Sequence, residues 1–223
     1  VGLFKNLPFD VERDLRSVGL VSRAGMVLAA STRMPGSLRE LIALAKAQPG
    51  KISYGSAGPG SISHIVGEAF AKAAGVSLLH VPYKGAAPAL ADLSGGHVDL
   101  VFDGFLTSNP LAQQGKAQIL AVSAPRRSPL NPNVPTFAEA GLTDYQAYSW
   151  NNLYAPAATP QPVIERLNQA LAHALAQPGV QQRLAQGASD ALGPTTPAEA
   201  DRFGHNERER WVPFVRSLQI DIS

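Results

Sequence analysis

Short apolar runs alternate with stretches of helical periodicity along most of the chain. Apolar runs of strand length lie at residues 17–22, 26–30, 51–56, 78–83, 98–102, 118–123 and 145–155. Apolar residues at helical spacing predict helices from Ser37 to the Pro49–Gly50 pair, at 61–74, 87–94, 110–114, 162–177 and 180–186, and from 197 onward. This alternation is typical of an α/β fold with a mixed, mostly parallel sheet.

Several residues mark where these elements begin, end or break. Arg23–Gly25 is predicted to separate the first two extended segments, and Pro213 is predicted to kink or end the last helix. Three helix starts have the capping-box pattern, which pairs Ser37 with Glu40, Thr136 with Glu139, and Thr196 with Glu199. The Thr136 box predicts a short helix that ends at Gly141.

The order of elements predicts two lobes. Residues 24–146 contain the regular alternation of strands and helices and are expected to form one compact α/β lobe. Residues 1–23 and 147–223 flank it and are expected to pack together as a second lobe. Two connecting segments between two lobes is the architecture of a hinged clamp.

Composition narrows the possible functions. The chain of 223 residues is 45% hydrophobic and 16% charged, with a net charge of +2 and scattered basic residues, so no nucleic-acid partner is expected. It contains no cysteine, which excludes disulfides, zinc–thiolate sites and thiol catalysis. Its apolar runs are shorter than the roughly 18 residues of a membrane span.

Three strand-to-helix loops between residues 51 and 104 are the most informative feature. The predicted strands at 51–56, 78–83 and 98–102 each end in a loop of small residues that leads to a helix. Backbone N–H groups at a helix start lack partners and lie at the positive end of the helix dipole. Three such starts at one end of a parallel sheet predict a pocket for a small anion.

The first loop resembles nucleotide-binding motifs but departs from each of them. Gly55 and Gly60 have the spacing of a P-loop, but Ser61 and Ile62 follow where Lys and Ser/Thr are required. The third glycine of a dinucleotide-binding fingerprint is replaced by Ser63, and no nucleophile elbow is present. The alternative to ligand binding here is a tight turn with Ser61 as the N-cap.

Other polar residues near these loops have two interpretations each. Lys84 could face an incoming carboxylate or lie in solvent, and Asp103 could accept from a ligand or cap the next turn. His64 and Glu68 are spaced to share a metal, but packing or hydrogen bonding is favoured because no third ligand is evident. Trp150 either forms one wall of a ligand-binding cleft or packs in the hydrophobic core, and the core is favoured.

Catalysis has no convincing candidate residues in this sequence. No acid–base pair, triad or metal cluster is evident, so an enzyme is not expected, and no cofactor or metal is implied. The alternative is an acyl or phosphoryl transferase that uses Ser61 with His64, which are spaced to touch on a first helical turn.

The chain resembles the Bug family of substrate-binding proteins, the extracytoplasmic receptors associated with tripartite tricarboxylate transporters. The similarity extends from about Lys5 to Asp221 and depends on the order of its motifs. These are NLPFD at 6–10, SLRELIALAKAQPGK at 37–51, YGSAGPGSISH at 54–64, HVPYKG at 80–85, ALADLSGGHVD at 89–99, VPTFAEAG at 134–141 and APAATP at 155–160.

The resemblance implies a two-lobed periplasmic-binding-protein fold that closes on a small carboxylate, such as a dicarboxylate, an acidic amino acid or an aromatic acid. Backbone amides, small hydroxyls and waters would hold the carboxylate. By position in the motifs, the expected ligand-binding residues are Ser56, Gly58, Gly60, Ser61, His64, Tyr83, Lys84, Gly85, Ala86 and Asp103. The implied partners are the membrane permease subunits of the transporter, with the receptor a periplasmic monomer whose signal peptide is removed.

This sequence also departs from the family pattern. It joins that pattern near Leu3, so we expect the first lobe to be incomplete, with weakened ligand binding and exposed apolar surface. A ligand-sensing regulatory domain with the same pocket is the alternative to a transport receptor, and the sequence does not separate the two.

Overall fold

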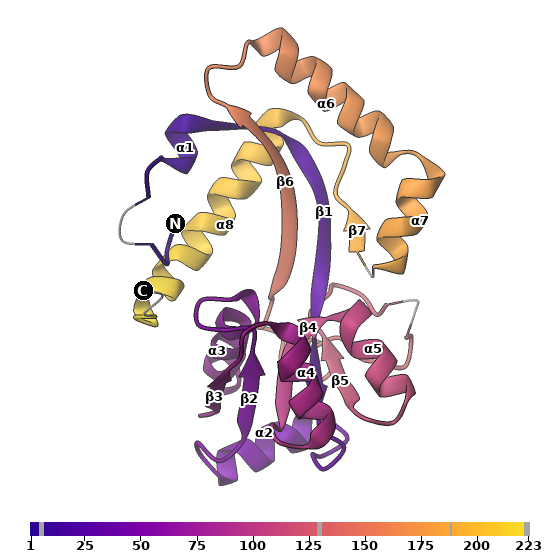
Figure 1. Cartoon of the computed structure of the whole chain (residues 1–223). Coiled ribbons are helices and arrows are strands. Elements are labelled where there is room, and N and C mark those ends of the chain that lie inside the picture. Colours follow the sequence, from indigo (N-terminus) through magenta and orange to yellow (C-terminus); the bar gives the residue numbers. More distant parts are fainter. Residues whose placement is uncertain (5–6, 129–130, 188, 221–223) are drawn as a thin grey trace. The chain divides into compact units, whose positions relative to one another are not determined.

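Helices and strands alternate from α1 to β5, after which β6 follows β5 and α7 follows α6 (Figure 1). The computed structural model describes residues 1–4, 7–128, 131–187 and 189–220. The helices are α1 (Val11–Asp14), α2 (Leu38–Ala47), α3 (Ile62–Ala74), α4 (Ala86–Gly95), α5 (Phe105–Gln113), α6 (Gln161–Leu175), α7 (Pro178–Gln186) and α8 (Pro197–Ser217). The strands are β1 (Leu15–Ala30), β2 (Ser53–Ser56), β3 (Leu79–Pro82), β4 (Leu100–Gly104), β5 (Gln118–Val122), β6 (Tyr148–Pro156) and β7 (Ser189–Ala191).

The chain divides into two compact units. Unit 1 comprises Val1–Arg23 and Trp150–Ser223, and unit 2 comprises Ala24–Ser149. Strands β1 and β6 each contribute residues to both units. The two lobes drawn from the sequence, and their movement as a clamp, stay a prediction.

The strands of unit 2 form a mixed sheet with the order β3-β2-β4-β1-β5. Strand β2 pairs in parallel with β3 and β4, whereas β1 runs antiparallel to both β4 and β5. The predicted mixed α/β architecture is therefore confirmed. Because β2, β3 and β4 are parallel, their carboxyl ends lie at one edge of the sheet.

The predicted break between the first two extended segments is wrong. Strand β1 continues without interruption through Arg23–Gly25. A Cβ on Gly25 would lie 3.0 Å from the Cβ of Ala124, so this glycine allows the strand to pass close to a neighbouring segment. In a strand, glycine can mark such a close approach as well as a break.

Three other sequence predictions need correction. Helix α5 begins at Phe105 directly after β4, so Pro110 lies inside the helix and not in its first turn. Helix α8 continues past Pro213 to Ser217. Thr136 and Glu139 do exchange both capping-box hydrogen bonds, but residues 137–141 form turns without a helix.

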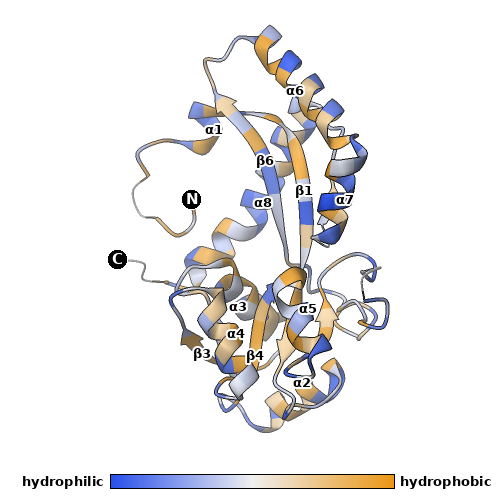
Figure 2. Ribbon diagram, turned by 45° about the vertical axis from the view of Figure 1, so that its right-hand side comes forward, coloured by the Kyte–Doolittle hydropathy of each residue, from blue (hydrophilic) through white to orange (hydrophobic). Residues whose placement is uncertain are grey.

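Helices cover both faces of the sheet of unit 2. Adjacent residues of β4 point to opposite faces. Val101 packs with Ala89 and Leu93 of α4, whereas Phe102 contacts Phe70 of α3 at a ring-centroid distance of 5.3 Å. Most of β4 is coloured hydrophobic (Figure 2), as expected for a strand buried on both sides.

Aromatic residues from distant parts of the sequence form the core beneath α3. The ring of Phe70 lies 6.0 Å from Phe137 and 5.8 Å from Tyr145, whose hydroxyl donates to the Val66 carbonyl oxygen at 3.0 Å. These contacts fix α3, and therefore its N-terminus, against the sheet.

Unit 1 is built around the first half of β1. Val18 on this strand packs with Ala155 of β6 and Ile164 of α6. Trp150 contacts Phe203 of α8 edge-to-face, with ring centroids 5.3 Å apart.

Among the described residues, no helix has both the length and the apolar composition needed to cross a membrane.

Candidate functional site

Three helices start where the parallel strands of unit 2 end. Strand β2 ends at Ser56 and leads to α3, β3 ends at Pro82 and leads to α4, and β4 ends at Gly104 and leads to α5. This edge of the sheet therefore gathers three helix N-termini, as the sequence predicts for an anion pocket.

Hydroxyl groups organise the first loop. The Ser56 side chain is fully buried and accepts from the Gly58 N–H at 3.2 Å. Ser61 donates to the Gly58 carbonyl oxygen at 2.7 Å and accepts from the His64 N–H at 3.3 Å, so it is the N-cap of α3. Gly58 has φ +123°, which only glycine adopts without strain. The hydroxyls hold the loop in one shape.

His80 belongs to this region, although the sequence analysis did not single it out. Its ring stacks on His64, with centroids 3.9 Å apart, and on Tyr54 at 4.9 Å. Its Nε2 lies 2.6 Å from Ser56 Oγ. In the structure, the parallel pairing of β2 and β3 places His80 opposite Tyr54. Both strands were predicted from the sequence, but a single sequence does not fix the register between them.

Both stacked histidines resist protonation. Burial, with a smaller effect from His64, lowers the pKa of His80 to about 4. Burial also lowers the pKa of His64, although the Glu68 carboxylate, 3.9 Å from His64 Nε2, acts in the opposite direction. The pair is therefore neutral at pH 7, and Ser56 faces an uncharged imidazole.

We expect the free energy of unfolding to decrease between pH 6.5 and about 4. The unfolded chain takes up a proton on His80 near pH 6.5, whereas the folded chain does so only near pH 4. The decrease in unfolding free energy that His80 causes is at most about 1.4 kcal/mol per pH unit, and about 1–2 kcal/mol in total after allowance for the partial exposure of the ring. Urea unfolding at pH 7 and pH 4.5 measures it.

The control for this prediction is His97→Phe, which removes an exposed histidine of the same unit. His80→Phe should lose less stability on acidification than either the wild type or this control. An equal loss in all three proteins would contradict the assignment to His80.

The second loop leaves the start of α4 open. Tyr83 donates through its N–H to the Ser56 carbonyl oxygen at 2.9 Å and through its hydroxyl to Asp92 at 2.7 Å. Burial and the bond to Asp92 raise the pKa of Tyr83 to about 12, so the hydroxyl stays protonated. Gly85 is the N-cap of α4 with φ +127°, and Ala86 begins the helix. Lys84 is exposed.

At the third predicted loop, β4 passes directly into α5, and the start of this helix is equally open. Gly104 is the N-cap of α5, and the Asp103 carboxylate accepts from the Thr107 hydroxyl at 2.6 Å. In the part of the chain that the structure describes, no side chain caps the first amides of α4 or α5. Backbone donors of two helices are thus left for another acceptor.

The contacts of Ser61 and His64 do not favour a nucleophile–base pair. The His64 Nδ1 accepts from the Gly60 N–H at 3.1 Å, while the Ser61 hydroxyl contacts Gly58 and Ser63. Across the described ranges, no group of three or more His, Asp or Glu residues is placed to hold a metal. The site offers amides and hydroxyls, which suit binding better than catalysis.

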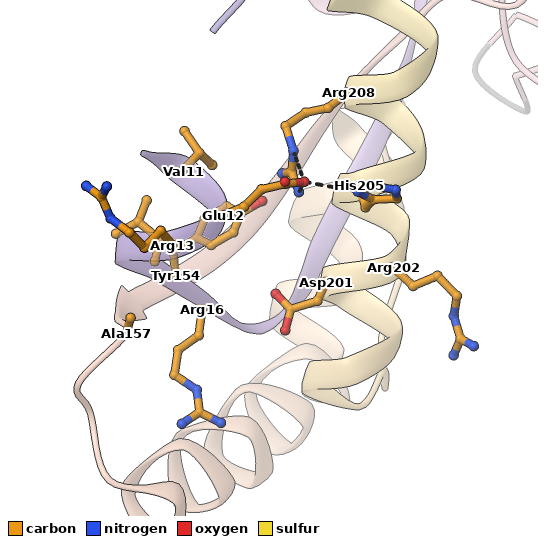
Figure 3. Close-up of a pocket in the computed structure, with 11 residues that line it drawn as sticks. Val11, Glu12, Arg13, Arg16, Tyr154, Ala157, Asp201, Arg202, His205 and Arg208 are labelled. Carbon is orange, nitrogen blue, oxygen red and sulfur yellow. Dashed lines mark hydrogen bonds and ion pairs between the residues drawn. The ribbon is translucent and has the colours of Figure 1, made fainter. Parts of the chain in front are cut away.

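Unit 1 has a separate pocket of about 480 Å³ (Figure 3). Charged residues line it, but several bind one another. Glu12 accepts from His205 at 3.0 Å and from Arg208 at 2.6 Å, which links α1 to α8. Asp201 accepts from the backbone N–H of Ser17 at 2.9 Å. These bonds link α8 to both α1 and β1.

The chain is similar to known proteins along nearly its whole length. Residues 2–220 match the family described as the tripartite tricarboxylate transporter family receptor. The "UPF0065 protein in tcbD-tcbE intergenic region" of Pseudomonas sp. (strain P51) is 36% identical over 99% of this chain and 66% of that protein. BugT of Bordetella pertussis is 32% identical over 97% of this chain and 66% of that protein. The chain thus spans just under two thirds of the length of these relatives.

Solved structures with the same fold include ligand complexes. An R. palustris protein with adipate has a TM-score of 0.84 and 31% identity, over 98% of this chain and 73% of that one. MatC from Rhodopseudomonas palustris with bound malate has a TM-score of 0.80 and 30% identity, over 96% of this chain and 74% of that one. The periplasmic binding protein BugD has a TM-score of 0.82 and 31% identity, over 99% and 74%.

The family match covers nearly the whole chain, and its relatives include a Bug protein, as the sequence motifs predict. This chain belongs to the tripartite tricarboxylate transporter receptor family.

Proposed function

We propose that this chain reversibly captures a small carboxylate in the periplasm without chemically changing it. The observation that carries the proposal is the pair of helix starts at Gly85 and Gly104, without side-chain caps, beside the loop that precedes α3. A carboxylate oxygen accepts two or more N–H bonds in such a place, each contributing about 1.5–3 kcal/mol.

The ligand complexes of similar proteins support the chemical class. One neighbour is described with adipate and another with malate, both dicarboxylates. The ten residues expected from the family motifs, from Ser56 to Asp103, lie at the carboxyl ends of β2 and β4, in the loops before α3 and α4, or in the first turns of these two helices. We therefore propose these residues as the binding site, with amides as the main donors and Lys84 as an exposed charge at its rim.

The family name suggests the destination of the ligand. The proposed receptor closes its two lobes on the carboxylate and presents the closed form to permease subunits of a tripartite transporter. A sensory role would use the same pocket and signal through closure. Catalysis is not needed for either role.

A thermal-shift panel tests the proposal. Adipate, malate, glutamate, citrate and benzoate are added at 5 mM, with adipamide as an uncharged control of the same length. A micromolar ligand should stabilise the folded chain by about 4–5 kcal/mol at this concentration. A shift with at least one acid, and none with adipamide, is expected. No shift with any acid would contradict carboxylate binding by this chain.

A further inference from the structure

His80 connects the strand β3 to the loop in front of α3. It stacks on Tyr54 and His64, and its Nε2 lies 2.6 Å from Ser56 Oγ. His80 lies on β3, and the carboxyl end of this strand leads to α4. His80 therefore belongs to the strand that precedes α4, while its side chain touches the strand that precedes α3.

The Ser56 hydroxyl, which His80 contacts, also lies against the backbone of Gly58. Ser56 Oγ lies 3.2 Å from the Gly58 amide nitrogen and 3.3 Å from the Gly58 carbonyl oxygen. A hydroxyl has one proton and can accept two bonds. If Ser56 donates to His80 Nε2, its lone pairs are directed to the Gly58 N–H, and the orientation of that peptide is fixed.

The His64 ring, on which His80 stacks, binds the backbone at the other end of the loop. A backbone N–H can only donate, so the bond from Gly60 N to His64 Nδ1 requires an unprotonated Nδ1. The neutral ring then carries its proton on Nε2, which faces Glu68 Oε1. Tyr54 donates to the same Glu68 oxygen at 2.6 Å. His80 stacks on both of these rings, His64 and Tyr54.

We propose that His80 is a positioning residue for the candidate site, where it holds the β2–α3 loop, and with it the N-terminus of α3, in place beside the other two helix starts. The inference rests on the proposed function for the identity of the ligand, but the shape of the loop can be measured without one. His80 acts through Ser56 and His64 and is not itself a ligand contact.

The first test measures amide hydrogen exchange at Gly58 and Gly60 in the unliganded protein. His80→Phe keeps a ring for stacking and removes the bond to Ser56, so exchange at Gly58 should accelerate by about tenfold while amides of β4 remain protected. His80→Gln retains a polar atom that can reach Ser56 and should restore part of the protection. Unchanged exchange at Gly58 and Gly60 in His80→Phe, or an equal increase throughout unit 2, would overturn the proposal.

The second test measures the affinity for adipate and malate by calorimetry. His80→Phe should weaken binding by about tenfold, His80→Gln by less, and His97→Phe not at all, since His97 is exposed at the far end of α4. Unchanged affinity in His80→Phe would overturn the role in binding. If the wild type binds no acid of the panel but the loop amides respond as expected, the positioning role stands and the proposed function fails.

Discussion

Replacing Gly85 with valine is expected to weaken carboxylate binding by at least about tenfold. Gly85 has φ +127° and ψ 171°, a conformation that residues with a side chain essentially do not adopt. A Cβ there would meet nothing within 4 Å, so the effect comes from the backbone and not from a clash. The peptide must rotate, which turns the first amides of α4 away from the ligand. Calorimetry with the acid found in the panel measures the loss.

Gly75→Val is the matched control for this prediction. Gly75 is the C-cap of α3 and has φ +63°, and a Cβ at this position would likewise meet nothing within 4 Å. The control variant introduces backbone strain at the opposite end of a helix, in the left-handed region, so it should lose stability but keep its affinity. Equal affinity losses in both variants would show that general strain, and not the start of α4, limits binding.

Phe70→Ala is expected to lower the free energy of unfolding by about 3–5 kcal/mol. Phe70 is 1% exposed and contacts the rings of Phe102, Phe137 and Tyr145. Removing the ring leaves a cavity between α3 and the sheet and deletes three aromatic contacts. Urea unfolding followed by circular dichroism measures the change.

Leu106→Ala provides the comparison. Leu106 is 58% exposed on α5, so its truncation should change stability by less than about 0.5 kcal/mol. If Phe70→Ala were no more destabilising than Leu106→Ala, the aromatic cluster would not be the core that fixes α3.

Local patterns predicted most elements of the fold. The helix start at Ser61 and the capping box of Thr196 with Glu199 are signals within four residues, and both form the predicted bonds. The failures arose where tertiary contacts override local rules. Gly25 allows β1 to pass close to Ala124 and does not break the strand. Helix α5 starts directly after β4, at Phe105, whose side chain is buried.

The candidate site was predictable in part. Strand-to-helix loops of small residues are visible in the sequence, and the parallel order of β2, β3 and β4 brings their ends to one edge. The role of His80 was not visible, because its contact with Ser56 joins residues 24 positions apart on neighbouring strands. Neither motif spacing nor hydrophobic periodicity encodes such a contact.

Carboxylate binding at the helix starts is tested most directly by titrating the ¹⁵N-labelled chain with the acid that binds in the panel and following the amide chemical shifts. We expect saturable downfield shifts at the amides of Ala86 and Phe105, the first residues of α4 and α5, with adipamide producing none. Saturable shifts confined to the pocket around Glu12 and Arg208 in unit 1, or no saturable shift at the helix starts, would contradict binding at this site.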